Sequence, residues 1–247
     1  MNASLSSQPA TPDTLAVPTM TPELQAKVEA VFASQRKTAL ALRASTAKQR
    51  IEKLRKLRDV IMDHREAIAD AAAKDFGRTA TEAEFGEMMP VLMDIADQCK
   101  HLKKWLKPRK VAPTAFMLGS SAEVRYEPRG RCLIIAPWNY PVTLALGPLV
   151  PAIASGNTVM LKTSEMAPHF SKVLVSIVQA TFEENEVAIF EGDVSVATAL
   201  LELPFDHCFF TGAPTIGKVV MGAAAKNLTS VTLELGGKSP TIIDEHA

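Results

Sequence analysis

Short apolar runs rich in β-branched residues alternate with helix-like stretches along the second half of the sequence, and this rhythm limits the fold more than any other feature. The candidate strands are 122–126, 132–136, 158–161, 187–190, 207–210 and 231–235, and the candidate helices between them are 142–154, 168–182, 194–201 and 214–225. The alternation predicts an α/β fold with a parallel sheet that is covered by helices on both faces. Ligands of such sheets bind beyond the carboxyl ends of the strands, so a site is expected there.

The first half of the sequence predicts long helices that precede the sheet. Apolar residues recur every three to four positions from Ile51 to Ala72, and Phe76-Gly77 is expected to end this helix because glycine is a common C-terminal cap. A second helix is expected over 81–106, with an apolar face made of Phe85, Met89, Leu92, Ile95, Ala96 and Leu102. Residues 1–20 are rich in Ser, Thr, Ala and Pro, which is typical of a flexible tail.

Charge, cysteine count and hydropathy exclude several classes of protein. Lys plus Arg and Asp plus Glu number 27 each, so no net positive charge favours binding to nucleic acid or to an anionic membrane. Three cysteines and five histidines lack the spacing of a disulfide framework or a metal site, so no metal is expected and a reducing, cytoplasmic setting is favoured. No apolar run is long enough for a membrane span.

Polar side chains follow two of the candidate strands. After strand 132–136 comes Pro137-Trp138-Asn139-Tyr140-Pro141, where the Asn139 amide can donate a hydrogen bond to a developing oxyanion or, alternatively, cap the next helix. After strand 158–161 comes Lys162-Thr163-Ser164-Glu165, where Lys162 and Glu165 can hold ribose hydroxyls or, alternatively, form a capping box or a local ion pair.

Glycines follow the last two candidate strands. The segment 211–219 has the G-x-x-x-x-G-K spacing of a phosphate loop, but Val219 stands where such a loop needs Ser or Thr for magnesium. An ATPase is therefore disfavoured, and a dinucleotide pyrophosphate at the start of the next helix is favoured. The alternative is a tight strand-to-helix turn that needs glycine for its backbone alone. Glu234 lies within an apolar strand, where partial burial would raise its pKa and suit a general base, unless the side chain points outward.

Taken in order, these four stretches resemble the aldehyde dehydrogenase superfamily. They read PWNYP at 137–141, KTSE at 162–165, FTGAPTIG at 210–217 and ELGGKSP at 234–240. The likeness is to the N-terminal half of the class 3 branch, which includes coniferyl aldehyde dehydrogenases. It implies that residues 21–247 form a Rossmann-like NAD(P)-binding domain with the first part of the oligomerisation hairpin near 120–131, and that the C-terminal catalytic domain is absent.

The resemblance also implies a role for each matching residue. Asn139 would stabilise the oxyanion, and Glu234 would activate the water that hydrolyses the thioester. The cofactor contacts would come from Pro137, Trp138, Lys162, Glu165, Gly212, Ala213, Pro214, Thr215, Ile216, Gly217, Leu235 and Gly236. The cofactor would be NAD or NADP, with NAD favoured because Glu165 would repel a 2′-phosphate.

The implied reaction is NAD(P)-dependent oxidation of an aldehyde, aromatic and coniferyl-like or long-chain, to the carboxylic acid by a homodimeric full-length parent. The family's nucleophilic cysteine lies beyond Glu234, in a G-Q-x-C context that none of Cys99, Cys132 and Cys208 shares. We therefore expect a chain truncated before that cysteine. The alternatives are a catalytically inactive dinucleotide-binding fragment and an acylating dehydrogenase, which Glu234 disfavours because a base for water is needed only by the hydrolytic type.

Overall fold

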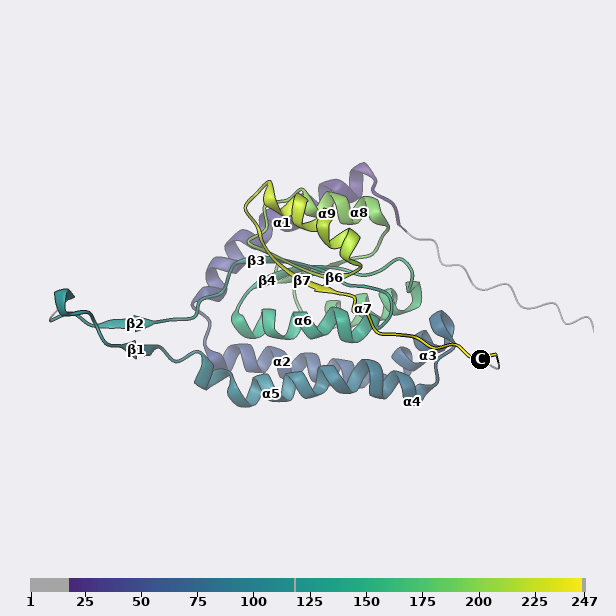
Figure 1. Ribbon diagram of the computed structural model, residues 1–247, viewed down its shortest axis with the longest axis horizontal. Helices are drawn as coiled ribbons and strands as arrows, with labels where there is room; N and C mark the ends of the chain where they lie inside the picture. Colours follow the sequence, from purple (N-terminus) through teal and green to yellow (C-terminus); the bar gives the residue numbers. More distant parts are fainter. Residues whose placement is uncertain (1–17, 118, 246–247) are drawn as a thin grey trace, which may run out of the picture.

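A five-stranded parallel sheet lies at the centre of the molecule (Figure 1). The structure is a computed structural model that describes residues 18–117 and 119–245. The strand order is β5-β4-β3-β6-β7, and the strands are β3 (Arg131–Ile135), β4 (Thr158–Lys162), β5 (Val187–Phe190), β6 (His207–Gly212) and β7 (Ser230–Leu235). Along the chain, the sheet starts with β3 in the middle and extends outward through β4 to β5. The chain then crosses to the other side of β3, where it forms β6 and β7. The predicted α/β fold with a parallel sheet is confirmed.

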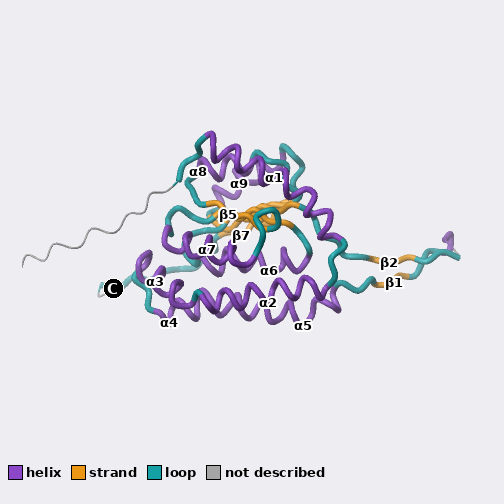
Figure 2. The backbone as a smooth tube through the Cα atoms, turned by 180° about the vertical axis from the view of Figure 1, so that it is seen from behind, coloured by secondary structure: helices purple, strands orange, loops and turns teal. Residues whose placement is uncertain are grey.

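Helices cover both faces of this sheet (Figures 1 and 2). One face carries α6 (Pro141–Ser155) and α7 (Pro168–Thr181), and the other carries α1 (Pro22–Arg43), α8 (Val194–Leu201) and α9 (Pro214–Ala225). Successive side chains of a strand point to opposite faces. Val159 and Leu161 of β4 therefore pack in one hydrophobic cluster, while Met160 packs in the other.

A further helical layer packs beneath α6 and α7 (Figure 1). It contains α2 (Ala47–Asp63), α3 (Arg65–Phe76) and α5 (Met89–Trp105). The single helix expected through Ile51 and Ala72 is divided at His64, whose Nδ1 donates to the Val60 carbonyl at 2.8 Å. The predicted end at Phe76 is confirmed, since Gly77 caps α3 with φ of 65°, a backbone conformation that glycine adopts without strain.

The helix expected over 81–106 contains one wide turn that the sequence pattern does not show. The short helix α4 (Ala80–Ala83) continues into the π-helix η1 (Glu84–Met88), which leads into α5. A π-turn inserts an extra residue and rotates the register of the helix. Phe85, Met89 and Ala96 are exposed, so their assignment to the buried face is wrong; the buried face of α5 runs through Val91, Ile95 and Leu102.

A two-stranded antiparallel arm projects away from the body (Figure 1). It consists of β1 (Arg109–Val111) and β2 (Ala122–Val124), with the 3-10 turn η2 (Ala115–Met117) near its tip. The segment 122–126, read as a candidate strand of the parallel sheet, therefore belongs to this separate ribbon. The arm starts at Arg109, earlier than the hairpin expected near 120–131, because the basic residues after α5 pair with β2.

The start of the described chain is tied to residues far along the sequence. The Pro18 carbonyl accepts from the Asp193 amide at 3.0 Å, and the Met20 amide donates to the Ser195 hydroxyl at 2.9 Å. The Gln35 side chain of α1 donates to the Val159 carbonyl at 2.9 Å. A flexible tail was expected over 1–20; its residues 1–17 lie outside the described residues, and Pro18 and Met20 make the two bonds just given. Among the helices of the described ranges, none is long and apolar enough to cross a membrane.

Candidate functional site

The four polar or glycine-rich stretches singled out in the sequence meet at one edge of the sheet. Because the strands are parallel, their carboxyl ends share that edge, and the residues after them follow the strand order. The Lys162–Glu165 turn follows β4, the 137–141 turn follows β3, the 212–217 turn follows β6, and Glu234 lies at the end of β7. The two central turns flank the point where the chain order reverses, which is where open α/β sheets bind ligands.

The 137–141 turn is held by residues from outside the sheet. The first residue before α6 is Tyr140, whose side chain does not cap the helix, so the alternative role of Asn139 as a helix cap is wrong. The carboxylate of Glu87 caps α6 instead, accepting from the amides of Val142 at 3.0 Å and Thr143 at 3.1 Å. Asn139 is exposed, and its backbone carbonyl accepts a hydrogen bond from the Arg78 guanidinium at 2.7 Å.

The turn after β4 contains an ion pair. The Lys162 side chain is buried, and its ammonium lies 2.9 Å from a carboxylate oxygen of the partly exposed Glu165. This is the local ion pair that the sequence left open as an alternative. Lys162 is therefore held in place beside a carboxylate that faces solvent. A ribose hydroxyl can donate to such a carboxylate and accept from the lysine, so the pairing is compatible with ribose binding.

The turn after β6 presents free backbone donors. Helix α9 starts with Ala213 as its N-cap and Pro214 as its first residue, and no side chain caps it. Proline has no N–H, and the amides of Thr215 and Ile216 have no acceptor among the described residues. Gly217 is buried because α9 packs closely on β7: a Cβ there would lie 2.9 Å from the Leu235 side chain.

Carboxylates occupy the start of every other helix that follows a strand of the sheet. Glu87 caps α6, as described above. Asp75 caps α7 by accepting from the amides of His169 at 3.3 Å and Phe170 at 2.9 Å. Asp193 caps α8 by accepting from the Ser195 amide at 2.8 Å. Since helix N-termini favour negative charge, α9 is the one of these four helices whose described surroundings leave room for an anion from outside.

Glu234 does not have the partial burial expected from its apolar strand. It lies in β7, at the edge of the sheet, and it is exposed, as are Leu235 and Gly236 after it. The expectation of a half-buried carboxylate is wrong for this chain because no described element packs over that side of β7. The outward-pointing alternative describes the observed position. Glu234 nonetheless pairs in register with Thr211 of β6, which places it beside the turn that leads to α9.

None of the three cysteines lies at this edge. Cys132 and Cys208 are the second residues of β3 and β6, near the amino ends of the strands, and they point to opposite faces. Burial raises the pKa of each of these two thiols to about 12. Burial also raises the pKa of Cys99, in α5. A thiolate is needed for nucleophilic attack, so these cysteines are poor nucleophiles at neutral pH.

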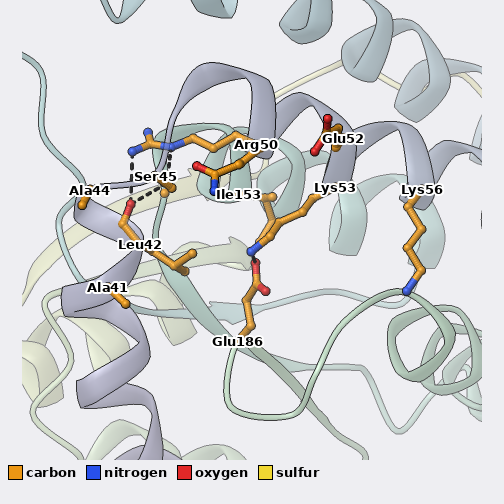
Figure 3. Close-up of a pocket in the computed structure, with 12 residues that line it drawn as sticks. Ala41, Leu42, Ala44, Ser45, Arg50, Glu52, Lys53, Lys56, Ile153 and Glu186 are labelled. Atoms are coloured by element: carbon orange, nitrogen blue, oxygen red, sulfur yellow. Dashed lines mark hydrogen bonds and ion pairs between the residues drawn. The ribbon is translucent and has the colours of Figure 1, made fainter.

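A hollow of about 630 Å³ at the opposite edge of the sheet is lined by charged groups that bind other parts of the chain (Figure 3). Arg50 is buried there and donates to the Leu42 carbonyl at the end of α1 and the Ser155 carbonyl at the end of α6. Lys53 pairs with Glu186 in the same hollow. These cations bind helix C-termini and a carboxylate, as expected for basic groups near negative helix ends. They leave little positive charge for a ligand.

Sequence reasoning missed the residues that hold the site turns, namely Arg78, Glu87 and Asp75. A signal for Glu87 was present: the buried positions Ala83, Glu87, Val91 and Ile95 recur every four residues, so a carboxylate falls within the apolar stripe. Charged residues are almost never fully buried without a partner. Such a break in a stripe therefore indicates a specific buried contact, although not what the contact is.

Comparison with known proteins places these features in a family context. Residues 6–247 match the profile of the aldehyde dehydrogenase family. The chain is 45% identical over 220 residues to a Pseudomonas aeruginosa protein named "Probable coniferyl aldehyde dehydrogenase", covering 89% of this chain and 46% of that protein. It is 41% identical over 218 residues to aldehyde dehydrogenase family 3 member B2 of Mus musculus, covering 88% of this chain and 46% of that protein.

Solved structures show the same likeness in three dimensions. Substrate-bound AldH of Staphylococcus aureus superposes with a TM-score of 0.83 at 37% identity, covering 88% of this chain and 48% of that one. A betaine aldehyde dehydrogenase variant of Staphylococcus aureus in complex with NAD⁺ gives a TM-score of 0.79 at 28% identity, covering 87% and 44%. The chain thus spans about half the length of the relatives it matches.

Proposed function

The chain belongs to the aldehyde dehydrogenase family, and from this premise we propose that it binds NAD(P)⁺ at the carboxyl edge of its sheet for the oxidation of an aldehyde to a carboxylic acid. The observation that carries the proposal is the uncapped start of α9 beside three carboxylate-capped helices. A pyrophosphate supplies the negative charge and the acceptor oxygens that the amides of Thr215 and Ile216 need.

The remaining contacts follow from the positions of the turns. Lys162 and Glu165 would hold the adenosine ribose. The turn from Gly212 to Gly217, with Ala213 and Pro214, would meet the pyrophosphate, while Pro137, Trp138, Leu235 and Gly236 would border the rest of the dinucleotide. NAD⁺ is carried by the betaine aldehyde dehydrogenase structure. We propose NAD over NADP here because the Glu165 carboxylate would repel a 2′-phosphate beside the ribose.

Two residues of this chain would act on the substrate. The exposed Asn139 amide would donate a hydrogen bond to the oxyanion that forms when a thiolate adds to the aldehyde carbonyl. Glu234 would take a proton from the water that hydrolyses the resulting thioester, and partial burial by further protein would raise its pKa toward that task. Since Cys99, Cys132 and Cys208 lie away from this edge, we assign the nucleophilic step to none of them.

We propose an apolar, aromatic or long-chain aldehyde as substrate. Two relatives point this way: one protein is named for coniferyl aldehyde, and another, from Staphylococcus aureus and 40% identical, is named for 4,4'-diaponeurosporen-aldehyde. The chain adds an observation of its own. The π-turn that contacts Tyr140 leaves Phe85 and Met89 exposed, so large apolar groups are present on the element beside the Asn139 turn.

We also propose a homodimer for the complete enzyme and a cytoplasmic setting. The arm of β1 and β2 extends away from the body and carries Phe116, which is fully exposed, near its tip. An arm with an exposed aromatic ring suits pairing with a second copy. The three cysteines are unpaired, which fits a reducing compartment.

Calorimetric titration with NAD⁺ tests the proposal. We expect saturable binding, and we expect Lys162→Met to weaken it about tenfold or more because the ribose loses its buried cation. Lys226→Met is the matched control, since Lys226 is an exposed lysine that pairs with Glu202 at the far end of α9. No heat of binding at millimolar NAD⁺, or equal weakening by both substitutions, would contradict the proposed cofactor site.

A second function is favoured by the cysteine geometry: a dinucleotide-binding chain without turnover. The raised thiol pKa values and the positions of Cys132 and Cys208 support it. Incubation with NAD⁺ and a panel of aldehydes, followed at the NADH absorbance, separates the two. NADH formation by these 247 residues would reject the inactive alternative, and binding without NADH would favour it.

A further inference from the structure

Glu87 is a fully buried carboxylate in the π-turn between α4 and α5. One oxygen accepts from the amides of Val142 and Thr143, and the other accepts from the Arg78 guanidinium at 3.1 Å. Burial raises the pKa of Glu87 above its ordinary value, and these hydrogen bonds and the nearby Arg78 charge offset only part of that rise. Burying a carboxylate costs much free energy unless it is paired and hydrogen-bonded, and Glu87 has both kinds of partner.

The same π-turn holds the 137–141 turn from a second side. The Thr143 hydroxyl donates to the backbone carbonyls of Gly86 at 2.8 Å and Glu87 at 2.9 Å. A Cβ on Gly86 would lie 3.1 Å from the Tyr140 ring, so the glycine lets the ring lie directly on the π-turn. The carboxylate and the carbonyls of one short segment therefore bind the first turn of α6.

Arg78 connects this carboxylate to the backbone of Asn139. One guanidinium nitrogen bonds Glu87, and another donates to the Asn139 carbonyl at 2.7 Å. The guanidinium lies 4.8 Å from the ring centroids of both Phe76 and Tyr140, a distance at which cations are attracted to aromatic faces. Trp138 in turn contacts the Phe76 ring, with 6.1 Å between the ring centroids.

We propose that Glu87 and Arg78 are positioning residues that hold the turn carrying Asn139 in the orientation needed to bind an oxyanion. The assignment rests on the proposed function for the role of the Asn139 amide, but the positioning itself is a property of the turn. An oxyanion donor acts only when it is held within a fraction of an ångström of the reacting oxygen. Three consecutive turn residues, Trp138, Asn139 and Tyr140, each contact this network.

Trp138 provides a direct reporter of the turn. The sequence has two tryptophans, so Trp105→Phe leaves Trp138 as the only source of tryptophan emission. In this background we would compare Glu87→Gln and Arg78→Met by acrylamide quenching. Glutamine keeps the shape of the side chain but removes the charge that Arg78 and two amides bind. Methionine keeps bulk near the two rings but removes both hydrogen bonds of the guanidinium.

We expect the quenching constant of Trp138 to rise at least twofold in both variants, while far-ultraviolet circular dichroism stays unchanged. Glu84→Gln is the matched control, because Glu84 lies in the same π-turn but its partner, Arg65, is at the surface. The control should quench like the parent. If either variant fails to fold, the other still supplies the test.

A folded Glu87→Gln or Arg78→Met variant that quenches like the parent would overturn the proposal, and so would an equal rise in Glu84→Gln. The quenching is measured without nucleotide or aldehyde, so its outcome does not depend on cofactor binding. If NAD⁺ does not bind but the quenching constant of Trp138 rises as expected in the variants, the proposed function alone is rejected. If NAD⁺ binds as expected but the quenching constant of Trp138 stays unchanged in the variants, the positioning role alone is rejected.

Discussion

Helices α6 and α9 follow neighbouring strands of the sheet, and both begin with a residue that supplies no side-chain cap. They differ in what binds their first amides. Glu87, from the helical layer below, occupies the start of α6, whereas the start of α9 has no acceptor in the described chain. The local sequences alone do not show this difference, because Pro stands at the first position of each helix. Tertiary contacts decide which helix end is closed and which is open.

The contrast extends to the two halves of the sheet. The half with β3, β4 and β5 is covered on both faces, and its helices α6 and α7 receive carboxylates from the layer of α2, α3 and α5. The half with β7 and α9 leaves apolar residues exposed, among them Ile216, Val219 and Leu235. The first half therefore has its helix starts closed by carboxylates of the chain, whereas the start of α9 in the second half stays open.

Removal of the carboxylate that caps α6 should have the largest effect. Glu87→Ala leaves the amides of Val142 and Thr143 without an acceptor and the partly exposed Arg78 without its carboxylate partner. It should lower the free energy of unfolding by about 2–4 kcal/mol, since each unsatisfied buried donor costs about 1–3 kcal/mol. Urea denaturation followed by circular dichroism measures this loss. Glu84→Ala removes only a surface pair and should cost under about 1 kcal/mol. Equal losses in the two variants would show that Glu87 is not special.

Closing the open helix end is the converse change. Ala213 has the extended backbone of an N-cap residue, with φ −71° and ψ 144°, so Ala213→Asp can cap α9. We expect it to raise the free energy of unfolding by about 1 kcal/mol. The new carboxylate would occupy the place of the pyrophosphate, so NAD⁺ affinity should fall at least about tenfold, or 1.4 kcal/mol.

Ala213→Asn separates the two effects, because it caps the helix without adding charge. Calorimetry should show a smaller loss of NAD⁺ affinity for this variant than for Ala213→Asp. If Ala213→Asp binds NAD⁺ as well as the parent, α9 does not meet the pyrophosphate and the comparison between the two helix ends loses its functional meaning.

The smallest expected effect is on the pH dependence of stability, through His207 of β6. Burial, and then the charge of Arg129, lower the pKa of His207 in β6. The unfolded chain therefore binds a proton more readily than the folded chain, so this residue contributes stability at neutral pH that is lost as the pH falls through and below 6.5. Urea unfolding at pH 7.5 and 5.5 should show a smaller decline in His207→Gln than in the parent.

The sequence predicts the elements of the sheet well because their signals are local. The bounds of β5, α8 and α9 agree with the expectation, since a charged residue directly follows each of these apolar runs. The edge at which the four motifs gather also follows from the alternation alone. The roles of Asn139, Lys162 and Glu234 as chemical groups stay predictions that the structure makes possible by position.

The rest depends on contacts between distant residues. The π-turn at Glu84–Met88 has no local signature, and Phe85 and Met89, which the apolar pattern assigned to the core, are exposed. Whether Glu234 is buried depends on what covers β7, which no pattern within the strand encodes. Glu87 shows the same limit: its place in an apolar stripe marks it as unusual, but only the folded chain shows that it binds α6.

The attachment of α1 to the sheet has a consequence for the order in which the chain can fold during synthesis. Of the described helices, α1 is synthesised before the others; it bonds through Gln35 to Val159, 124 residues later, and Met20 just before it bonds to Ser195, 175 residues later. Contacts of such long range are slow to form because a large loop must close first. Helix α1 must therefore wait, with Val28 and Phe32 exposed, until most of the sheet has been translated.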